Sequence, residues 1–336
     1  MSTKIAINGF GRIGRIFFRQ AFNSPEVDIV ALNDLGSVEN LAYLLKYDTV
    51  YGKYYKPVEA SGDKLIVDGK EIIVLQEKDP AKLPWKNLGI DIVIESTGVF
   101  ESYDKAKAHL DAGAKRVVIT APPKDDKTPV STPNVGWENI SFGPITSNAS
   151  CTTNATNPIM KILSETVGIK KALLTTVHAY TATQAIVDGP DKKDDFRRGR
   201  AGVQNIVPST TGAAKATTKI LTDLDGKFDG LAIRVPIISG SLIDITLLSE
   251  RKTSGQEINE ILRAAAQKDE WQGIFTVTDE PIVSSDILGN PHGSIVDLSL
   301  TKVIDGDLVK VFAWYDKEWG YGAMLLKHVL KASELL

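Results

Sequence analysis

The sequence contains a single cysteine, Cys151, in the stretch SNASCTTNATNP. Small polar residues surround it, and the residues that follow have a helical pattern ending at Gly168. The unpaired N–H groups in the first turn of a helix stabilise a thiolate and lower the pKa of a thiol placed there. A lone cysteine can also be an inert, buried residue, but this setting favours a reactive nucleophile.

The four histidines are the candidates for a base that takes the proton of this thiol. His109 and His328 lie in helical patterns, and we expect both to be solvent-exposed or partly packed. His292 lies in the loop GNPHGS. His178 lies near the end of the predicted strand LLTTVHAYT and is followed by polar residues, a position typical of catalytic groups in α/β sheets.

The segment NGFGRIG places Gly9, Gly11 and Gly14 in the spacing G-x-G-x-x-G. It follows a predicted strand and opens a predicted helix, and Asp34 ends the next predicted strand about 20 residues beyond the last glycine. Such glycines let the backbone approach a pyrophosphate, and the acidic residue binds a ribose 2′-hydroxyl. An unrelated glycine-rich turn would need all these features by coincidence. Because a carboxylate repels a 2′-phosphate, the pattern predicts NAD rather than NADP.

A thiol and a dinucleotide site together predict the oxidation of an aldehyde. The thiolate adds to the carbonyl and forms a thiohemiacetal, which loses hydride to the nicotinamide and leaves a thioester. The stretches FRRGR, AIRVP and STTGAAKA could bind the phosphate of a phosphorylated aldehyde, although FRRGR could also be a solvated loop and STTG a helix cap. The residues concerned are Arg197, Arg198, Arg200, Arg234, Ser209, Thr210, Thr211 and Gly212.

The elements that would position these residues differ between the two halves of the chain. The first half alternates strands and helices, which indicates a doubly wound, mostly parallel sheet, and Asp68-Gly69 predicts a hairpin. The second half has longer strands and segregated helices, which indicates an α+β domain. Strands are predicted over 4–8, 27–33, 64–67, 70–74, 89–98, 116–120, 172–180, 228–236, 241–250, 293–300 and 308–315, and helices over 12–22, 103–112, 157–168, 256–267 and 321–333.

The composition limits the class of protein. A length of 336 residues suggests two domains of roughly 150 residues each, and a net charge of −3 gives no general attraction to nucleic acid or membranes. One cysteine excludes an internal disulfide and a cysteine-rich metal site, and it fits a reducing compartment. The chain shows neither a signal peptide nor an apolar run of about 18 residues, so we expect a cytoplasmic enzyme without a metal ion.

Six motifs resemble those of the glyceraldehyde-3-phosphate dehydrogenase family, in the same order and over essentially the whole chain. They are INGFGRIGR, ESTGVF, SNASCTTN, TTVHAYTATQ, PSTTGAAKA and WYDKEWGY. The resemblance implies an α/β fold with a Rossmann NAD-binding domain over 1–150 and an α+β catalytic domain with a mostly antiparallel sheet over 151–317. It implies that a C-terminal helix over 318–336 packs back on the NAD-binding domain.

The resemblance also implies a reaction of glycolysis and gluconeogenesis, in which D-glyceraldehyde 3-phosphate, NAD and inorganic phosphate give 1,3-bisphosphoglycerate. Cys151 would be the nucleophile, and His178 would activate it and assist hydride transfer. Thr181 and Arg234 would hold the substrate phosphate. The residues implied at the pocket for inorganic phosphate are Ser150, Thr152, Thr211 and Gly212, with Arg198 in a nearby loop.

The motif and the resemblance together predict the cofactor residues. These are Gly9, Gly11, Arg12, Ile13, Asp34, Lys78, Thr97, Thr120 and Lys317. Leu35 and Pro190 look like the NAD-preferring choices of the family. The family forms homotetramers, in which the loop over 187–202 reaches toward a neighbouring cofactor.

Three positions depart from the family pattern. Lys317 stands where the family usually has an asparagine that holds the nicotinamide carboxamide, and a lysine can donate a hydrogen bond but cannot accept one. Ala155 replaces a frequent cysteine and should mainly reduce the risk of an oxidative disulfide. The stretch VPIISGS differs at what we expect to be a subunit contact.

Two other functions stay open at the level of the sequence. Erythrose-4-phosphate dehydrogenase resembles the same family but ends its reaction in hydrolysis rather than phosphorolysis. The second alternative is a catalytically idle relative that binds NAD or RNA. The pair Cys151 and His178 argues against idleness, and the acidic balance argues against strong RNA binding.

Overall fold

The computed structural model describes residues 2–190 and 195–336. Residues 191–194, part of the loop that the family resemblance places near a neighbouring cofactor, lie outside the described residues. Contacts divide the chain into two compact units, which we call unit 1 (Met1–Ala149 with Gly322–Leu336) and unit 2 (Ser150–Tyr321).

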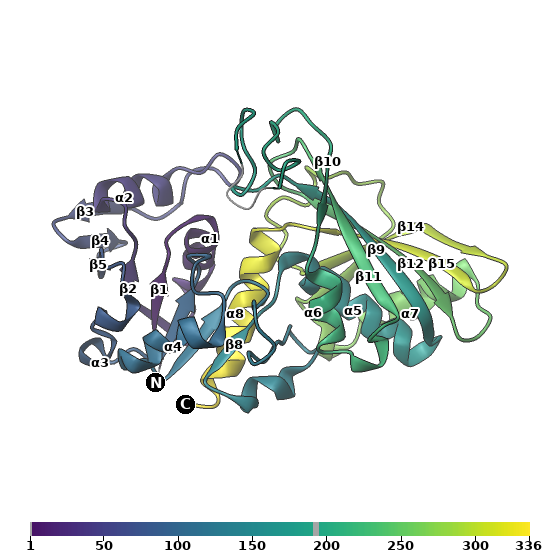
Figure 1. The fold of residues 1–336 in the computed structure, drawn as a ribbon, viewed down its shortest axis with the longest axis horizontal. Coiled ribbons are helices and arrows are strands. Elements are labelled where there is room, and N and C mark those ends of the chain that lie inside the picture. Colours follow the sequence, from purple (N-terminus) through teal and green to yellow (C-terminus); the bar gives the residue numbers. More distant parts are fainter. Residues whose placement is uncertain (1, 191–194) are drawn as a thin grey trace. The chain divides into compact units, whose positions relative to one another are not determined.

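Unit 1 is built on a sheet of eight strands in the order β3-β4-β5-β2-β1-β6-β7-β8 (Figure 1). Neighbours from β5 to β8 are parallel, and only β3-β4-β5 is antiparallel, which confirms the predicted doubly wound sheet. The strands are β1 (Thr3–Asn8), β2 (Val27–Asn33), β3 (Val58–Ser61), β4 (Lys64–Val67), β5 (Lys70–Leu75), β6 (Ile92–Glu95), β7 (Arg116–Ile119) and β8 (Ile145–Ser147). The helices are α1 (Arg12–Ala21), α2 (Val38–Lys46), α3 (Trp85–Leu88), α4 (Tyr103–Asp111) and α8 (Trp319–Ser333), the last of which belongs to unit 1 from Gly322 onward.

The strand order of unit 1 creates a switch point beside β1. The chain winds from β1 to β2 on one side and to β6 on the other. Parallel register aligns Asn8 with Asn33 and with Glu95, so the carboxyl ends of three strands meet at one edge. Open α/β sheets bind their ligands at such an edge.

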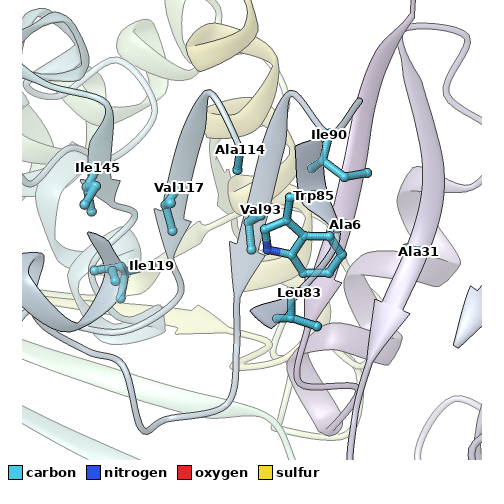
Figure 2. Close-up of a cluster of buried hydrophobic side chains, with 11 residues drawn as sticks. Ala6, Ala31, Leu83, Trp85, Ile90, Val93, Ala114, Val117, Ile119 and Ile145 are labelled. Atoms are coloured by element: carbon cyan, nitrogen blue, oxygen red, sulfur yellow. The ribbon is translucent and has the colours of Figure 1, made fainter. Parts of the chain in front are cut away.

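A hydrophobic core fixes these strands in place. Figure 2 shows Ala6, Val93, Val117 and Ile145 on neighbouring strands, with the indole of Trp85 against the first two. All five side chains are fully buried. The strands β6 and β7 are buried at every residue, as expected for parallel strands that are covered on both faces.

The predicted hairpin is also present in unit 1. Asp68 and Gly69 join β4 and β5 with φ of 51° and 80°, the left-handed conformation at both central residues of a two-residue turn. This confirms the hairpin that Asp-Gly predicted between two strand patterns.

Unit 2 contains a sheet of seven strands in the order β10-β11-β9-β12-β15-β14-β13. Only β9 with β11 and β13 with β14 pair in parallel, which confirms an α+β unit with a mostly antiparallel sheet. The strands are β9 (Ile169–Ala179), β10 (Val207–Thr210), β11 (Phe228–Val235), β12 (Ser241–Ser249), β13 (Phe275–Thr278), β14 (Ser294–Ile304) and β15 (Leu308–Tyr315). The helices are α5 (Cys151–Thr166), α6 (Ala213–Thr218) and α7 (Gly255–Ala266).

One face of the unit 2 sheet is covered and the other is open. Helix α5 packs on β9, β12, β14 and β15, and it contacts α6 and α7 on the same side (Figure 1). On β9, Leu174 faces the helices and is 1% exposed, whereas Leu173 points to the other side and is 65% exposed. On β11, Leu231 is likewise 47% exposed. The sheet therefore presents apolar side chains on its uncovered face.

Three expectations from the sequence were wrong. His109 and His328 are not solvent-exposed, because both are completely buried in unit 1. The strand predicted over 89–98 shortens to Ile92–Glu95, because Gly89 ends α3 in a left-handed conformation and a loop begins after Glu95. The helix predicted over 157–168 begins earlier, at Cys151, and Pro158 lies inside it. Among the described residues, no helix is long and apolar enough to cross a membrane.

Candidate active site

The glycine turn after β1 brings two segments of unit 1 into close contact. Gly9 has a φ of +92°, and a Cβ there would lie 2.7 Å from backbone atoms of Ser96 and Thr97. Gly14, in the first turn of α1, would place a Cβ 2.3 Å from the carbonyl oxygen of Gly9. At Gly11 a Cβ would meet nothing within 4 Å. Two of the three motif glycines are therefore required by the packing of unit 1, and the third is not.

A cavity of about 450 Å³ lies at the switch point of unit 1. Among the predicted cofactor residues, Gly9, Gly11, Asp34, Lys78 and Thr97 line it. The other lining residues are Asn8, Asn33, Leu35, Glu77, Pro80, Ser96, Val99 and Phe100. Sequence reasoning did not name Asn8 and Asn33 as site residues, although a polar residue at the end of each predicted strand was a usable signal.

Three predicted cofactor residues of unit 1 are not among those that line the cavity. Arg12 and Ile13 lie in the first turn of α1, and the Arg12 guanidinium forms an ion pair with Asp48. Thr120 follows β7, and its N–H and hydroxyl both donate to the carbonyl of Glu95, at 3.0 and 3.1 Å. Their roles in binding NAD stay predictions.

Asp34 ends β2 at the wall of the cavity, and backbone groups hold its carboxylate. Oδ2 accepts a hydrogen bond from the N–H of Phe10 at 2.7 Å, and Oδ1 accepts one from the N–H of Gly36 at 3.0 Å. The charge of Asp34 is therefore fixed at the mouth of the glycine turn, where a ribose hydroxyl could donate to it.

In unit 2, the first turn of α5 positions the thiol. The hydroxyl of Ser150 caps the helix by accepting from the N–H of Thr153 at 3.1 Å, so Cys151 is the first helical residue. Its Sγ lies 3.5 Å from Nε2 of His178, which comes from the end of β9. The structure thus brings together the two residues that sequence reasoning selected as nucleophile and base.

The environment of Cys151 corrects one expectation. We expected a lowered pKa, but burial raises the pKa of the thiol, and this effect outweighs the positive charges of Lys317 and Arg234, which lower it. The start of a helix is not enough to offset the partial burial of the thiol. Burial of the thiol therefore favours its neutral form.

His178 is neutral for a related reason. Burial, and then the positive charge of Arg234, lower the pKa of His178 to about 3. The parallel register of β9 and β11 places Arg234 directly beside His178, and the guanidinium contacts the ring. Nδ1 lies 2.6 Å from the carbonyl oxygen of Ala179. When Nδ1–H donates to this carbonyl, Nε2 is left as an acceptor for the thiol proton.

Tyr315 is a central residue of this site that sequence reasoning missed. Its hydroxyl lies 2.9 Å from Oγ1 of Thr152 and 2.8 Å from Oγ1 of Thr176, and its ring packs edge-on against His178. It thereby connects α5 to β9 and β15. A polar aromatic residue at the end of the strand in WYDKEWGY was the available signal.

Two of the residues predicted to bind anions, Arg198 and Thr211, already hydrogen-bond other groups of unit 2. Arg198 donates to Oγ of Ser209 at 3.0 and 2.8 Å and pairs with Asp195 at 3.2 Å. Thr211 precedes Gly212, the N-cap of the short helix α6, and the hydroxyl of Thr211 accepts from the N–H of Ala213 at 3.2 Å.

The remaining anion candidates are Thr152, Thr181 and Gly212. The hydroxyl of Thr152 is buried against Tyr315, so an anion could reach its backbone more readily than its side chain. Thr181 lies after β9, and its hydroxyl is 2.9 Å from that of Thr183. Gly212 is exposed at the start of α6.

Lys317 lies in the turn between β15 and α8 and is 6% exposed. Its Nζ is 3.0 Å from Oε1 of Glu318. Its charge lowers the pKa of both Cys151 and His178, which places the ammonium within the electrostatic reach of the catalytic pair. Asp316 anchors this turn, since its carboxylate accepts from four donors. Among the described residues, no cluster of His, Cys, Asp and Glu could hold a metal ion.

Comparison with known proteins identifies the family. The family model described as "Glyceraldehyde 3-phosphate dehydrogenase, NAD binding domain" matches residues 3–103, and that described as "Glyceraldehyde 3-phosphate dehydrogenase, C-terminal domain" matches residues 150–317. The chain is 47% identical over 333 residues to glyceraldehyde-3-phosphate dehydrogenase 2 of Bacillus subtilis, covering 98% of this chain and 97% of the relative. It is 48% identical over 331 residues to glyceraldehyde-3-phosphate dehydrogenase of Streptomyces coelicolor and 46% identical over 327 residues to glyceraldehyde-3-phosphate dehydrogenase B of Aspergillus oryzae, with 97% of both chains covered in each case. These matches confirm the predicted family, cofactor and class of enzyme. The chain belongs to the glyceraldehyde-3-phosphate dehydrogenase family and is an NAD-dependent oxidoreductase.

Proposed function

We propose that the protein oxidises D-glyceraldehyde 3-phosphate with NAD and inorganic phosphate and releases 1,3-bisphosphoglycerate. The observation that carries this proposal is the pair formed by Cys151 and His178, with Sγ 3.5 Å from Nε2. The names of the relatives and of the matching family models favour this substrate over erythrose 4-phosphate. An idle relative would have no need for a partly buried thiol beside a neutral imidazole.

The first step follows from the protonation states of the pair. Because the thiol and the imidazole are both neutral, proton transfer from Sγ to Nε2 accompanies the attack of sulfur on the aldehyde carbon. The carbonyl of Ala179 holds Nδ1–H and stabilises the imidazolium as it forms. The carbonyl oxygen then takes the proton from Nε2, which gives a neutral thiohemiacetal on Cys151.

His178 acts a second time in the oxidation. Bound NAD supplies the hydride acceptor for this step. As hydride leaves the thiohemiacetal carbon, Nε2 takes the hydroxyl proton, and a thioester remains on Cys151. The Nε2 proton is then released to solvent. Inorganic phosphate attacks the thioester carbon and the C–S bond breaks, so the acyl group leaves as an acyl phosphate, and the sulfur takes the proton of the phosphate and restores the thiol.

The phosphate groups are assigned by the same proposal. Arg234 and Thr181 would bind the phosphate of the substrate, and the position of Arg234 beside His178 would bring the aldehyde to the thiol. The start of α6 at Thr211 and Gly212 would hold the attacking phosphate. This phosphate would also be bound by the backbone of Ser150 and Thr152 at the start of α5. Arg198 would add a positive charge from the loop near Ser209.

The roles of the two units are part of the proposal. Unit 1 would be the NAD-binding domain, against which the C-terminal helix α8 packs, and unit 2 would be the catalytic domain. The predicted homotetramer is supported by the uncovered face of the unit 2 sheet, where Leu173 and Leu231 are exposed. The predicted cytoplasmic location is supported by the single reduced thiol that the reaction requires.

One set of kinetic measurements tests the proposal. Formation of NADH is followed at saturating NAD with glyceraldehyde 3-phosphate or erythrose 4-phosphate, each with and without inorganic phosphate. The proposal expects turnover with glyceraldehyde 3-phosphate that depends on phosphate. Turnover of equal rate without phosphate would indicate hydrolysis of the thioester instead, and no turnover with either aldehyde would support an idle relative.

A further inference from the structure

A chain of buried polar side chains lies behind the cavity of unit 1, and the reaction described above does not use it. Its members are Asn8, Asn33, Trp85, Glu95 and His109, and none is more than 5% exposed. Apolar side chains could fill this space without the cost of removing polar groups from water. These polar residues should therefore contribute by fixing the positions of the segments that they join, rather than by adding stability.

Trp85 determines which ring nitrogen of His109 is the acceptor. An indole N–H can only donate, and Nε1 of Trp85 lies 3.0 Å from Nδ1 of His109. Nδ1 is therefore the acceptor, and Nε2 carries the N–H that donates. Figure 2 shows this indole among apolar side chains of the core, and Trp85 is fully buried. The Nε2–H of His109 then donates to Oε2 of Glu95 at 3.1 Å.

The carboxylate of Glu95 accepts four hydrogen bonds, two on each oxygen. Oε2 accepts from His109 and from Nδ2 of Asn8, the latter at 2.6 Å. Oε1 accepts from the N–H and the hydroxyl of Thr97, at 2.9 and 2.5 Å. All four partner groups can donate, which suits an ionised carboxylate and not its amide.

These bonds reach the wall of the cavity at several points. Thr97 belongs to the segment that packs directly over Gly9. Oδ1 of Asn8 accepts from Nδ2 of Asn33 at 2.7 Å. Nδ2 of Asn33 also donates to the carbonyl of Glu77, and Oδ1 of Asn33 accepts from the N–H of Glu77, each at 2.9 Å. The lining residues Asn8, Asn33, Glu77 and Thr97 are thus connected through one buried carboxylate.

We propose that Glu95 and His109 are positioning residues for the dinucleotide cavity, and that the relay from Trp85 through His109 and Glu95 to Thr97 holds its wall in the NAD-binding geometry before NAD arrives. A wall that is already ordered spares the entropy that binding would otherwise cost. Neither residue lines the cavity, so both act through Thr97 and Asn8. The inference rests on the proposed placement of NAD in this cavity.

The first test is Glu95→Gln, which keeps the size of the side chain but turns one acceptor into a donor. The new NH2 group must face either the donors of Thr97 or those of Asn8 and His109. We expect the Kd for NAD, measured by isothermal titration, to rise about tenfold. At saturating NAD, kcat should stay within about twofold of the wild type.

The second test compares two substitutions at His109. His109→Leu removes both hydrogen bonds and should weaken NAD binding about tenfold. His109→Gln can still accept from Trp85 and donate to Glu95, so it should recover most of the affinity. His328→Leu is the matched control, because His328 is an equally buried histidine of unit 1 that bonds Thr146 and lies outside the cavity lining. It should lower the melting temperature without changing the Kd for NAD.

The outcomes separate the relay from the proposed function. Failure of the wild type to bind NAD would refute the placement of NAD, and failure to turn over would refute the proposed function. If the wild type binds NAD normally but Glu95→Gln and both His109 variants bind it equally well, the relay is purely structural and the inference is overturned. If His109→Leu does not fold, Glu95→Gln still decides the question. Alkylation of Cys151 should proceed at the wild-type rate in every folded variant, because the thiol belongs to unit 2.

Discussion

Gly9 and Gly11 belong to one motif, yet the structure predicts opposite consequences for replacing them by alanine. At Gly9, φ is +92° and the new Cβ would lie 2.7 Å from the backbone of Ser96 and Thr97. At Gly11, φ is −69° and a Cβ would meet nothing within 4 Å. Gly9→Ala should therefore destabilise unit 1, whereas Gly11→Ala should not.

The size of the effect at Gly9 follows from two contributions. A left-handed backbone conformation costs a non-glycine residue roughly 1–2 kcal/mol. In addition, the contact with the Ser96–Thr97 segment must open from 2.7 Å to about 3.4 Å, an ordinary contact distance, and Glu95 holds this segment by hydrogen bonds. We expect a loss of at least about 2 kcal/mol, which corresponds to a fall in melting temperature of about 4–8 °C. Gly11→Ala should fall within about 1 kcal/mol of the wild type.

Thermal unfolding followed by circular dichroism measures this difference, and titration with NAD adds a second readout. Gly11 lines the cavity, so Gly11→Ala should weaken NAD binding although the protein stays stable. Gly14→Ala should resemble Gly9→Ala, because its Cβ would lie 2.3 Å from the Gly9 carbonyl oxygen. Equal melting temperatures for the Gly9 and Gly11 variants would refute the reasoning from close approach.

Four further predictions concern the catalytic pair, the cofactor and pH. Cys151→Ser should lower kcat about 10⁴-fold or more while NAD titration shows unchanged binding, because the change removes the nucleophile and leaves unit 1 intact; a parallel loss of NAD affinity would contradict the separation of roles. Asp34→Ala should relax the bias against NADP, which a comparison of kcat/KM for the two cofactors checks. Lys317→Gln should raise the pKa of Cys151, because it removes a positive charge that lowers this pKa. The rate of alkylation by iodoacetamide, measured against pH, should then rise at a higher pH than in the wild type. Burial lowers the pKa of His328 to about 3, so below about pH 6.5 the unfolded chain binds a proton at this residue that the folded chain does not bind. The free energy of unfolding should therefore fall as the pH drops from about 6.5 toward 3, by up to about 1.4 kcal/mol per pH unit. Urea unfolding at pH 7 and pH 5 measures this loss, which should be smaller in His328→Leu.

Most of the fold could be predicted from local patterns. The strands that end at Asn8 and Asn33 and the helix that begins at Arg12 were predicted at those residues, because strand, glycine turn and helix each have their own signal. The turn at Asp68 and Gly69 was equally clear, since few residue pairs tolerate left-handed conformations in succession.

The rest depended on contacts between distant segments, which periodicity does not reveal. The burial of His109 is an example, because the helical pattern around it gives no sign of the indole 24 residues away that hydrogen-bonds its ring. The raised pKa of Cys151 is another, since the position at a helix start was visible in the sequence but the depth of burial was not. Tyr315 became recognisable as a site residue only when β15 was placed two strands from β9.

The division of unit 1 into two chain segments has a consequence for how the protein is made. Its last strand, β8, ends at Ser147, but the part of α8 that contains His328, which hydrogen-bonds Thr146 of that strand, is synthesised only after the whole of unit 2. Unit 2 is a continuous segment and can complete its fold first. At a synthesis rate of about 5–20 residues per second, Thr146 therefore waits roughly ten seconds or longer for its hydrogen-bond partner on α8. During that interval unit 1 lacks its second chain segment, Gly322–Leu336, which makes this stage the one at which chaperone binding should matter most.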